Sequence, residues 1–189
     1  MYSADNNVSR TLVSEEYRLL NESAAVMELP CGALSLKGRD AFDFLQRLST
    51  NDVLHIANGN AGMTILVNEK AKIIDIVTVL HVGDEIILVL ESREAVKMEQ
   101  WLNRFLFTED VLINNISAEY LHRLVIGKEG GKRIQELLNI TMPEERTNSS
   151  GFMLQVSGGF VFQDFLWQLP AYHLFLKKNE SDRIIEHLV

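Results

Sequence analysis

One carboxylate of this sequence, Asp75, lies where a charge is costly. It interrupts the apolar run from Ile73 to Leu80, whose β-branched residues are typical of a buried strand. An ionised carboxylate in such a strand needs a polar partner or contact with water. Asp75 shares its strand face with Val77 and Val79, which are apolar and do not mark a solvated face. Asp75 is therefore a candidate for acid–base or ligand-binding chemistry, and a solvated position on the strand is the alternative.

Three other patterns fall short of the chemistry that they suggest. Residues 127–132 are glycine-rich, follow a predicted strand and begin a helix, a context that favours phosphate binding. The Walker pattern requires Ser or Thr after its lysine, and Arg133 stands there, so a glycine-rich turn is the better interpretation. Ser157 lacks the preceding glycine of a hydrolase nucleophile elbow. Cys31 has no histidine nearby in the sequence to activate it, which favours a structural cysteine.

The histidine spacing and the net charge exclude further classes of protein. No two histidines have the i, i+4 spacing with a central Glu that places two ligands on one helix face, so no metal site is predicted. The 18 Lys and Arg against 26 Asp and Glu give a formal charge of -8. Such a charge repels nucleic acid and anionic membranes. The five histidines are His55, His81, His122, His173 and His187.

Length, composition and cysteine usage indicate a cytoplasmic globular protein. A chain of 189 residues, 47% of them hydrophobic, buries a substantial core. The single cysteine favours a reducing compartment, and the polar residues 1–10 do not form a signal peptide. No apolar run approaches the roughly 18 residues of a membrane span. We expect one domain over residues 1–189, or two subdomains that meet near the polar stretch 141–151.

The elements that must position Asp75 are helices alternating with hairpins. Short turns at 68–70 and 83–84 join the strands of this region, and strands joined by such turns pair antiparallel. This order predicts an α+β fold of antiparallel sheets covered by helices on one face. Helices are expected at 11–21, 39–48, 93–106, 132–138 and 181–189, and strands at 25–29, 33–36, 63–67, 73–82, 85–90, 111–114, 120–126, 153–163 and 171–177.

The segment 34–53 carries a specific series of motifs. A strand is followed by the turn Gly38-Arg39-Asp40-Ala41, a helix with Phe44-Leu45-Gln46, and the exit Thr50-Asn51-Asp52-Val53. This series resembles a signature of the glycine-cleavage T-protein (aminomethyltransferase) family and its folate-binding relatives. Further matches follow in the family's order, from Val67-Asn68 through the Lys72-to-Asp75 strand to the Trp101-Leu102 helix. The resemblance runs from about Tyr17 to the end and covers the amino-terminal half of a typical member.

The resemblance implies tetrahydrofolate as cofactor and a small set of site residues. Asp75 falls where the aminomethyltransferases keep a catalytic aspartate, thought to position or activate the folate nitrogen that accepts the one-carbon unit. Asn68 matches the asparagine that usually ends the preceding strand, and a turn-forming role explains it equally well. Trp167 is expected to offer the folate an aromatic wall. Family members resemble a pseudo-symmetric ring of α+β units with tetrahydrofolate in a central cavity.

Several positions depart from the family pattern. The family's G-G-x-x-D-D becomes residues 71–76, which lose both glycines and the second aspartate. Met63 replaces a usual tyrosine, Glu91 a frequent asparagine, and Leu169 the glutamate that contacts folate. The K-G-C-x-x-G-Q-E motif of the branch linked to iron–sulfur enzyme maintenance does not occur. Any enzymatic activity is therefore expected to be aminomethyltransferase-like at most.

Two hypotheses about function remain at this point. The first is a tetrahydrofolate-binding protein of one-carbon metabolism without full transferase activity. The second is a non-catalytic regulatory or interaction module that retains the fold and works as a homodimer or with a companion protein, because a missing half exposes apolar surface. The surroundings of Asp75 discriminate between them. A cavity with aromatic and polar walls favours folate, and a filled core or an interface favours the module.

Overall fold

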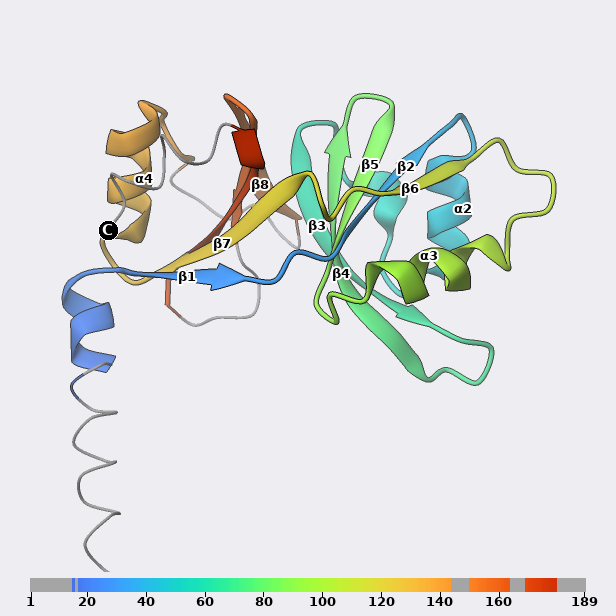
Figure 1. The fold of residues 1–189 in the computed structure, drawn as a ribbon, viewed down its shortest axis with the longest axis horizontal. Helices are drawn as coiled ribbons and strands as arrows, with labels where there is room; N and C mark the ends of the chain where they lie inside the picture. Colours follow the sequence, from blue (N-terminus) through green and yellow to red (C-terminus); the bar gives the residue numbers. More distant parts are fainter. Residues whose placement is uncertain (1–14, 16, 144–149, 164–168, 180–189) are drawn as a thin grey trace, which may run out of the picture.

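The computed structural model describes residues 15, 17–143, 150–163 and 169–179. The ten strands of this part of the chain form one curled antiparallel sheet in the order β1-β7-β10-β9-β8-β3-β4-β5-β2-β6 (Figure 1). The strands are β1 (Ala25–Leu29), β2 (Ala33–Lys37), β3 (Asn60–Val67), β4 (Ile73–Val82), β5 (Glu85–Leu90), β6 (Leu112–Asn115), β7 (Tyr120–Ile126), β8 (Ser150–Val156), β9 (Gly159–Gln163) and β10 (Ala171–Lys177). The helices are α2 (Ala41–Leu48), the 3-10 helix η1 (Val53–His55), α3 (Ala95–Asn103) and α4 (Gly130–Leu138), and residues 17–22 are also helical.

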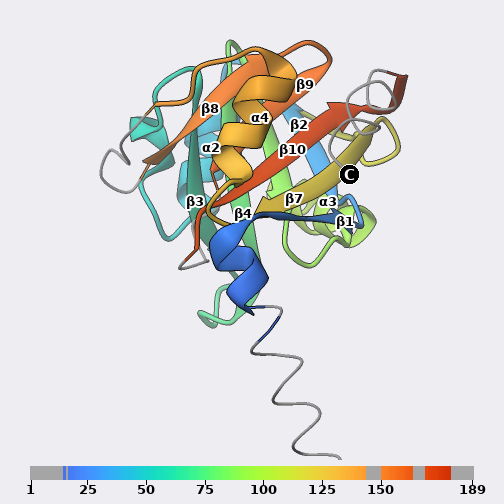
Figure 2. The same ribbon diagram turned by 90° about the vertical axis from the view of Figure 1, so that its left-hand side faces the viewer.

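The sheet has two halves, which are joined where the start of β8 pairs with the start of β3. Helices α2 and α3 pack on the half that contains β4 and β5. Helix α4 packs on the half that contains β9 and β10 (Figure 2). A third cluster of side chains from both halves, including Leu80 of β4 and Phe175 of β10, fills the space between them. The helices therefore cover the outer faces, and the two inner faces share a core.

Strand β5 shows how the sequence produces these layers. Its residues Ile86, Leu88 and Leu90 belong to the core under α2 and α3. The intervening Ile87 and Val89 belong to the core between the two halves. Because both faces are covered, β5 has a continuous apolar sequence rather than an alternating one. The predicted α+β class, with helix-flanked antiparallel sheets, is confirmed.

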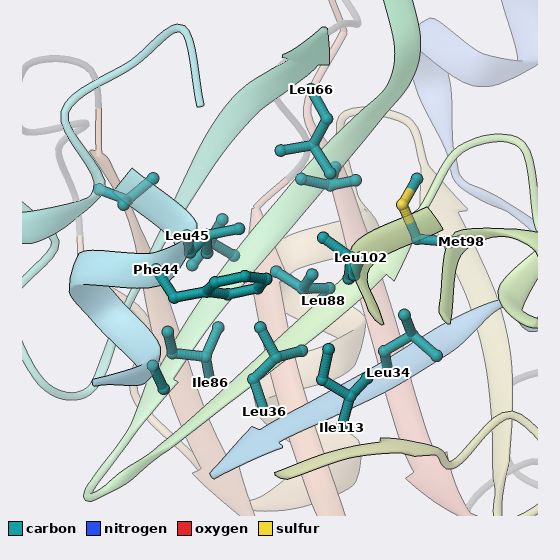
Figure 3. Packing of buried hydrophobic residues seen from close by; sticks show 14 of the residues in the cluster. Leu34, Leu36, Phe44, Leu45, Leu66, Ile86, Leu88, Met98, Leu102 and Ile113 are labelled. Atoms are coloured by element: carbon teal, nitrogen blue, oxygen red, sulfur yellow. The ribbon is translucent and has the colours of Figure 1, made fainter. Parts of the chain in front are cut away.

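The core under α2 and α3 follows the predicted apolar spacing of both helices. Figure 3 shows Phe44 and Leu45 of α2 and Leu102 of α3 gathered near Leu36 and Leu88 of the sheet. All five side chains have at most 1% of their surface exposed. Burying each such side chain contributes about 1.5–3 kcal/mol. The outer core thus holds both helices against the sheet.

The predicted strand over residues 153–163 was wrong. The structure has two strands there, β8 and β9, which pair with each other as a hairpin. Ser157 and Gly158 form the two-residue turn, in which Gly158 has a φ of 77° that glycine adopts without strain. Apolar residues flank this turn on both sides, and the turn signal Ser157-Gly158-Gly159 between them was missed.

Several sequence predictions concern residues outside the described ranges. Trp167, the helix predicted at 181–189 and residues 144–149 of the predicted subdomain boundary lie outside them. The end of that boundary, Ser150 and Gly151, belongs to β8. None of the helices in the described ranges has the length and apolarity that a membrane crossing requires.

The loop between α3 and β6 is closed by one carboxylate. Oε2 of Glu109 accepts hydrogen bonds from the backbone N–H groups of Phe107 and Thr108, at 2.8 and 3.1 Å. Oε1 of Glu109 pairs with the Arg47 guanidinium of α2 at 2.5 Å. The backbone N–H of Phe107, with Arg47 next in importance, lowers the pKa of Glu109 from 4.5 to about 2. Glu109 therefore ionises more readily in the folded protein than in the unfolded chain.

We expect Glu109 to make part of the stability depend on acid pH. Because its folded pKa is the lower one, the stabilisation is complete above about pH 4.5 and disappears as the pH falls towards 2. Denaturant unfolding of the wild type and Glu109→Gln, followed between those two pH values, measures this effect. The free energy of unfolding of the wild type should fall more steeply. Parallel curves for the two proteins would show that the loop does not depend on this charge.

Candidate functional site

The structure places Asp75 in the interior of the protein. The residue lies near the start of β4, opposite Leu66 of β3, and 4% of its surface is exposed. The register between β3 and β4 shifts at the next pair, between Leu66 and Val67. Val77 and Val79, which share the strand phase of Asp75, are completely buried. A solvated position for Asp75, the alternative from the sequence, is thereby excluded.

The Asp75 carboxylate binds the chain just after β5. Its Oδ1 accepts the backbone N–H of Ser92 at 3.0 Å and that of Ile76 at 2.8 Å. Its Oδ2 accepts the Ser92 hydroxyl at 2.5 Å. The Ser92 oxygen in turn accepts the backbone N–H of Glu94 at 3.3 Å, which leads into α3. These bonds compensate the cost of burying a charge and fix the connection between β5 and α3.

A close backbone contact fixes the same connection from its other side. Arg93 has a φ of 62°, a left-handed conformation that is uncommon for residues other than glycine. Gly32 lies directly against it, so that a Cβ on Gly32 would be 2.4 Å from Cα of Arg93. The carbonyl of Gly32 also accepts the N–H of Leu90 at 2.8 Å. The start of α3 is thus held between Asp75 and Gly32.

A hollow of about 320 Å³ lies beside this connection, and we call it the α3 hollow. Lys97, Trp101 and Arg104 have i, i+4 and i+7 spacing and line one wall from the same side of α3. Ser92 lines the hollow, whereas the Asp75 carboxylate that it binds lies behind it. The complete lining is Ile74, Ser92, Glu94, Lys97, Met98, Gln100, Trp101 and Arg104. An aromatic ring, two cations and one carboxylate therefore surround a space beside Asp75.

The polar groups of the α3 hollow differ in how they are satisfied. Nζ of Lys97 pairs with the Glu94 carboxylate at 2.5 Å. Within the part of the chain that the structure describes, Arg104 makes no ion pair and the Trp101 indole makes no hydrogen bond. Trp101 is half-buried and stacks edge-on against Phe105, with the ring centroids 5.0 Å apart. The hollow thus keeps an unpaired guanidinium next to an aromatic surface.

A second hollow, of about 340 Å³, lies near the start of α3 and includes Cys31 and Arg93 in its lining. Burial raises the pKa of the Cys31 thiol to about 11, and the charge of Lys178 only partly opposes this effect. Cys31 therefore remains a protonated thiol at neutral pH, as expected for a structural cysteine. The described ranges contain no group of three or more His, Cys, Asp or Glu side chains placed to hold a metal ion.

The other predicted site residues occupy different positions. The side-chain oxygen of Asn68 accepts the backbone N–H groups of Lys70 and Lys72, at 3.0 Å each, within the turn between β3 and β4. Asn68 therefore has the turn-forming role that the sequence left open beside folate binding. Trp167 lies outside the described residues. Asp75 is thus the predicted residue that the structure places next to a hollow.

Sequence reasoning missed the residues that complete this site. Trp101 was recognised only as part of the Trp101-Leu102 helix that resembles the family, and Ser92 and Arg104 were not identified at all. The spacing of Lys97, Trp101 and Arg104 was the signal available in the sequence, because it places the three on one helix face. A pair of buried histidines was also missed. His122 and His173 lie 2.7 Å apart (Nε2 to Nδ1) in the core between the sheet halves.

The fold defines the class of protein. It superposes on the glycine cleavage system aminomethyltransferase T of Bartonella henselae with a TM-score of 0.77 and 16% identity, over 92% of this chain and 47% of that one. A chain of the heterotetrameric sarcosine oxidase of Corynebacterium sp. U-96 also has the fold, with a TM-score of 0.59 and 14% identity, over 87% of this chain and 81% of that one. This chain therefore shares an α+β fold with these two proteins.

Sequence comparison identifies the family. The family described as GCVT N-terminal domain matches residues 1–161, and the chain belongs to it. The aminomethyltransferase of Staphylococcus carnosus is 27% identical over 134 residues, which are 70% of this chain and 37% of that protein. That of Bacillus pumilus is 32% identical over 109 residues, which are 57% of this chain and 30% of that protein. The chain thus matches less than half the length of these relatives.

Proposed function

We propose that this chain is a cytoplasmic tetrahydrofolate-binding protein of one-carbon metabolism that does not carry out full aminomethyl transfer. The observation that carries this proposal is the α3 hollow, an aromatic and charged space beside the aspartate at the family's catalytic position. Membership of the GCVT N-terminal domain family supports folate as the ligand. The single cysteine, Cys31, suits a reducing compartment.

The chemistry of folate matches the walls of the α3 hollow. Its flat rings can stack on the indole of Trp101, which supplies a large apolar surface. The amino and amide groups of a pterin require hydrogen-bond partners, and Gln100 and Glu94 offer them at the wall of the hollow. The carboxylates of a folate can pair with a cation such as Arg104. Each part of the ligand thus has a complementary group in this space.

The bonding of Asp75 argues against catalysis of transfer. A general base must come within hydrogen-bond reach of the proton that it removes. Asp75 is 4% exposed, its carboxylate is bound by Ser92 and Ile76, and Ser92 stands between it and the hollow. The aspartate therefore supports the wall of the site rather than reaching a ligand. The loss of the family's second aspartate agrees with this role.

Titration calorimetry with tetrahydrofolate tests the proposal. We expect saturable binding to the wild type and an affinity lower by about tenfold in Trp101→Leu, because stacking and apolar contact are lost. Phe107→Leu is the matched control, since Phe107 is an aromatic residue with 83% exposure and does not line the hollow. No heat with the wild type at millimolar ligand would overturn folate binding. Equal losses of affinity in the two variants would show that the ligand does not bind in the α3 hollow.

A second candidate function is an interaction module. It is favoured by the likeness to a chain of a heterotetrameric enzyme, which this chain matches over 81% of that chain's length. In that case the protein acts as a homodimer or with a companion chain. Light scattering of the purified protein distinguishes one chain of 21.5 kDa from a dimer, and a co-purifying protein would identify a companion. A monomer that binds folate would favour the first candidate.

A further inference from the structure

The end of α3 that carries Arg104 has an unused positive charge. Arg104 lines the α3 hollow and caps the C-terminal end of the helix. A cation at this place interacts favourably with the helix dipole, which is sufficient reason for an arginine there. The dipole does not explain why the guanidinium lacks an ion pair with any described residue while the neighbouring Lys97 has one.

The two cations of the hollow are therefore not equivalent. Lys97 is neutralised by Glu94, at 2.5 Å, so this end of the hollow has little net charge. Arg104 lies two turns further along the helix and leaves the other end positive. Trp101 lies between the two residues on the same helix face. The hollow thus has a neutral polar end, an aromatic middle and a cationic end.

We infer that this hollow selects ligands with an aromatic body and an acidic tail, and that Arg104 binds the tail carboxylate. A guanidinium binds a carboxylate through two parallel N–H bonds, which gives direction as well as affinity. The inference rests on the proposed function and identifies the glutamyl part of the folate as the group that Arg104 recognises. Tetrahydropteroate amide, in which a neutral carboxamide replaces the glutamyl group, keeps the aromatic contacts and has no carboxylate to form this pair.

The test compares tetrahydrofolate with tetrahydropteroate amide by calorimetry at low salt. We expect the wild type to prefer tetrahydrofolate by about fivefold, a modest factor because Arg104 is exposed to solvent. Arg104→Gln should remove the preference by weakening the binding of tetrahydrofolate alone, and its binding of tetrahydropteroate amide should be unchanged. Arg93→Gln, in the neighbouring hollow that contains Cys31, is the matched control and should keep the preference.

The outcomes separate this inference from the proposed function. Equal affinity of the wild type for both ligands would overturn the role of Arg104 and leave folate binding intact. If Arg104→Gln still preferred tetrahydrofolate, the role of Arg104 would also be overturned, because another residue would then bind the tail carboxylate. Binding of neither ligand would overturn both proposals. Because Arg104 is exposed, its replacement is not expected to disturb folding, and circular dichroism checks this.

Discussion

Gly38→Ala is expected to lower the free energy of unfolding by at least about 4 kcal/mol, a large part of the stability of an ordinary domain. Gly38 has a φ of 130°, a conformation that is strained for any residue with a side chain. A Cβ at this position would lie 2.0 Å from the backbone oxygen of Asp110, far inside the contact distance. The chain must therefore separate two backbone segments in order to accept a methyl group.

The measurement is denaturant unfolding followed by circular dichroism. Gly83→Ala is the matched control, because Gly83 has a φ of 61° and a Cβ there would meet nothing within 4 Å. The free energy of unfolding of the control should fall by only about 1 kcal/mol, which is the cost of the left-handed conformation for alanine. Similar losses in both variants would show that the contact with Asp110 is unimportant.

The contacts of Gly38 explain why it belongs to the motif by which the family was recognised. The turn that it begins brings Asp40 against the chain just before β6, where Oδ2 of Asp40 accepts the N–H of Asp110 at 2.8 Å. Ala41, the last residue of the motif, begins α2 and is completely buried. The motif is thus a packing device that joins α2 to the edge of the sheet. Its presence predicts the fold and carries no information about catalysis.

Local patterns were sufficient to predict most of the fold. The apolar spacing of α2 and α3 and the turns that flank β4 depend on residues close together in the sequence, so they could be identified there. The hairpin of β8 and β9 was missed because apolar residues stand on both sides of its short turn. The local signal of that turn is Ser157-Gly158-Gly159, within which Gly158 has a positive φ.

The surroundings of Asp75 were beyond reach of the sequence. The sequence showed a costly carboxylate but not its partner, because Ser92 follows a different strand and meets Asp75 only after β4 and β5 have paired. The α3 hollow is likewise a product of packing, since Ile74 of β4 and Trp101 of α3 face it from two elements. The burial of Asp75, taken alone, would suggest a catalytic residue. Its hydrogen bonds instead favour a role in supporting the chain between β5 and α3.

Asp75→Ala is expected to lower the free energy of unfolding by about 3 kcal/mol. Three buried or partly buried donors, the N–H groups of Ile76 and Ser92 and the Ser92 hydroxyl, would lose their acceptor. Asp75→Asn should cost only about 1 kcal/mol, because the amide oxygen can still accept backbone N–H groups and the Ser92 hydroxyl can turn to accept from the amide nitrogen. Urea unfolding of the three proteins measures the series.

The same pair of variants separates support from catalysis. If Asp75 acts only by holding the chain after β5 in place, the wall of the α3 hollow should be intact in Asp75→Asn. The dissociation constant of Asp75→Asn for tetrahydrofolate should then lie within about threefold of the wild-type value. Glu136→Ala, which deletes an exposed carboxylate of α4, should leave the free energy of unfolding within about 0.5 kcal/mol of the wild-type value and calibrates the effect of losing a surface charge. If Asp75→Ala is as stable as this control, the carboxylate does not hold the connection. If Asp75→Asn keeps full stability but loses the ligand, the carboxylate itself contacts the folate.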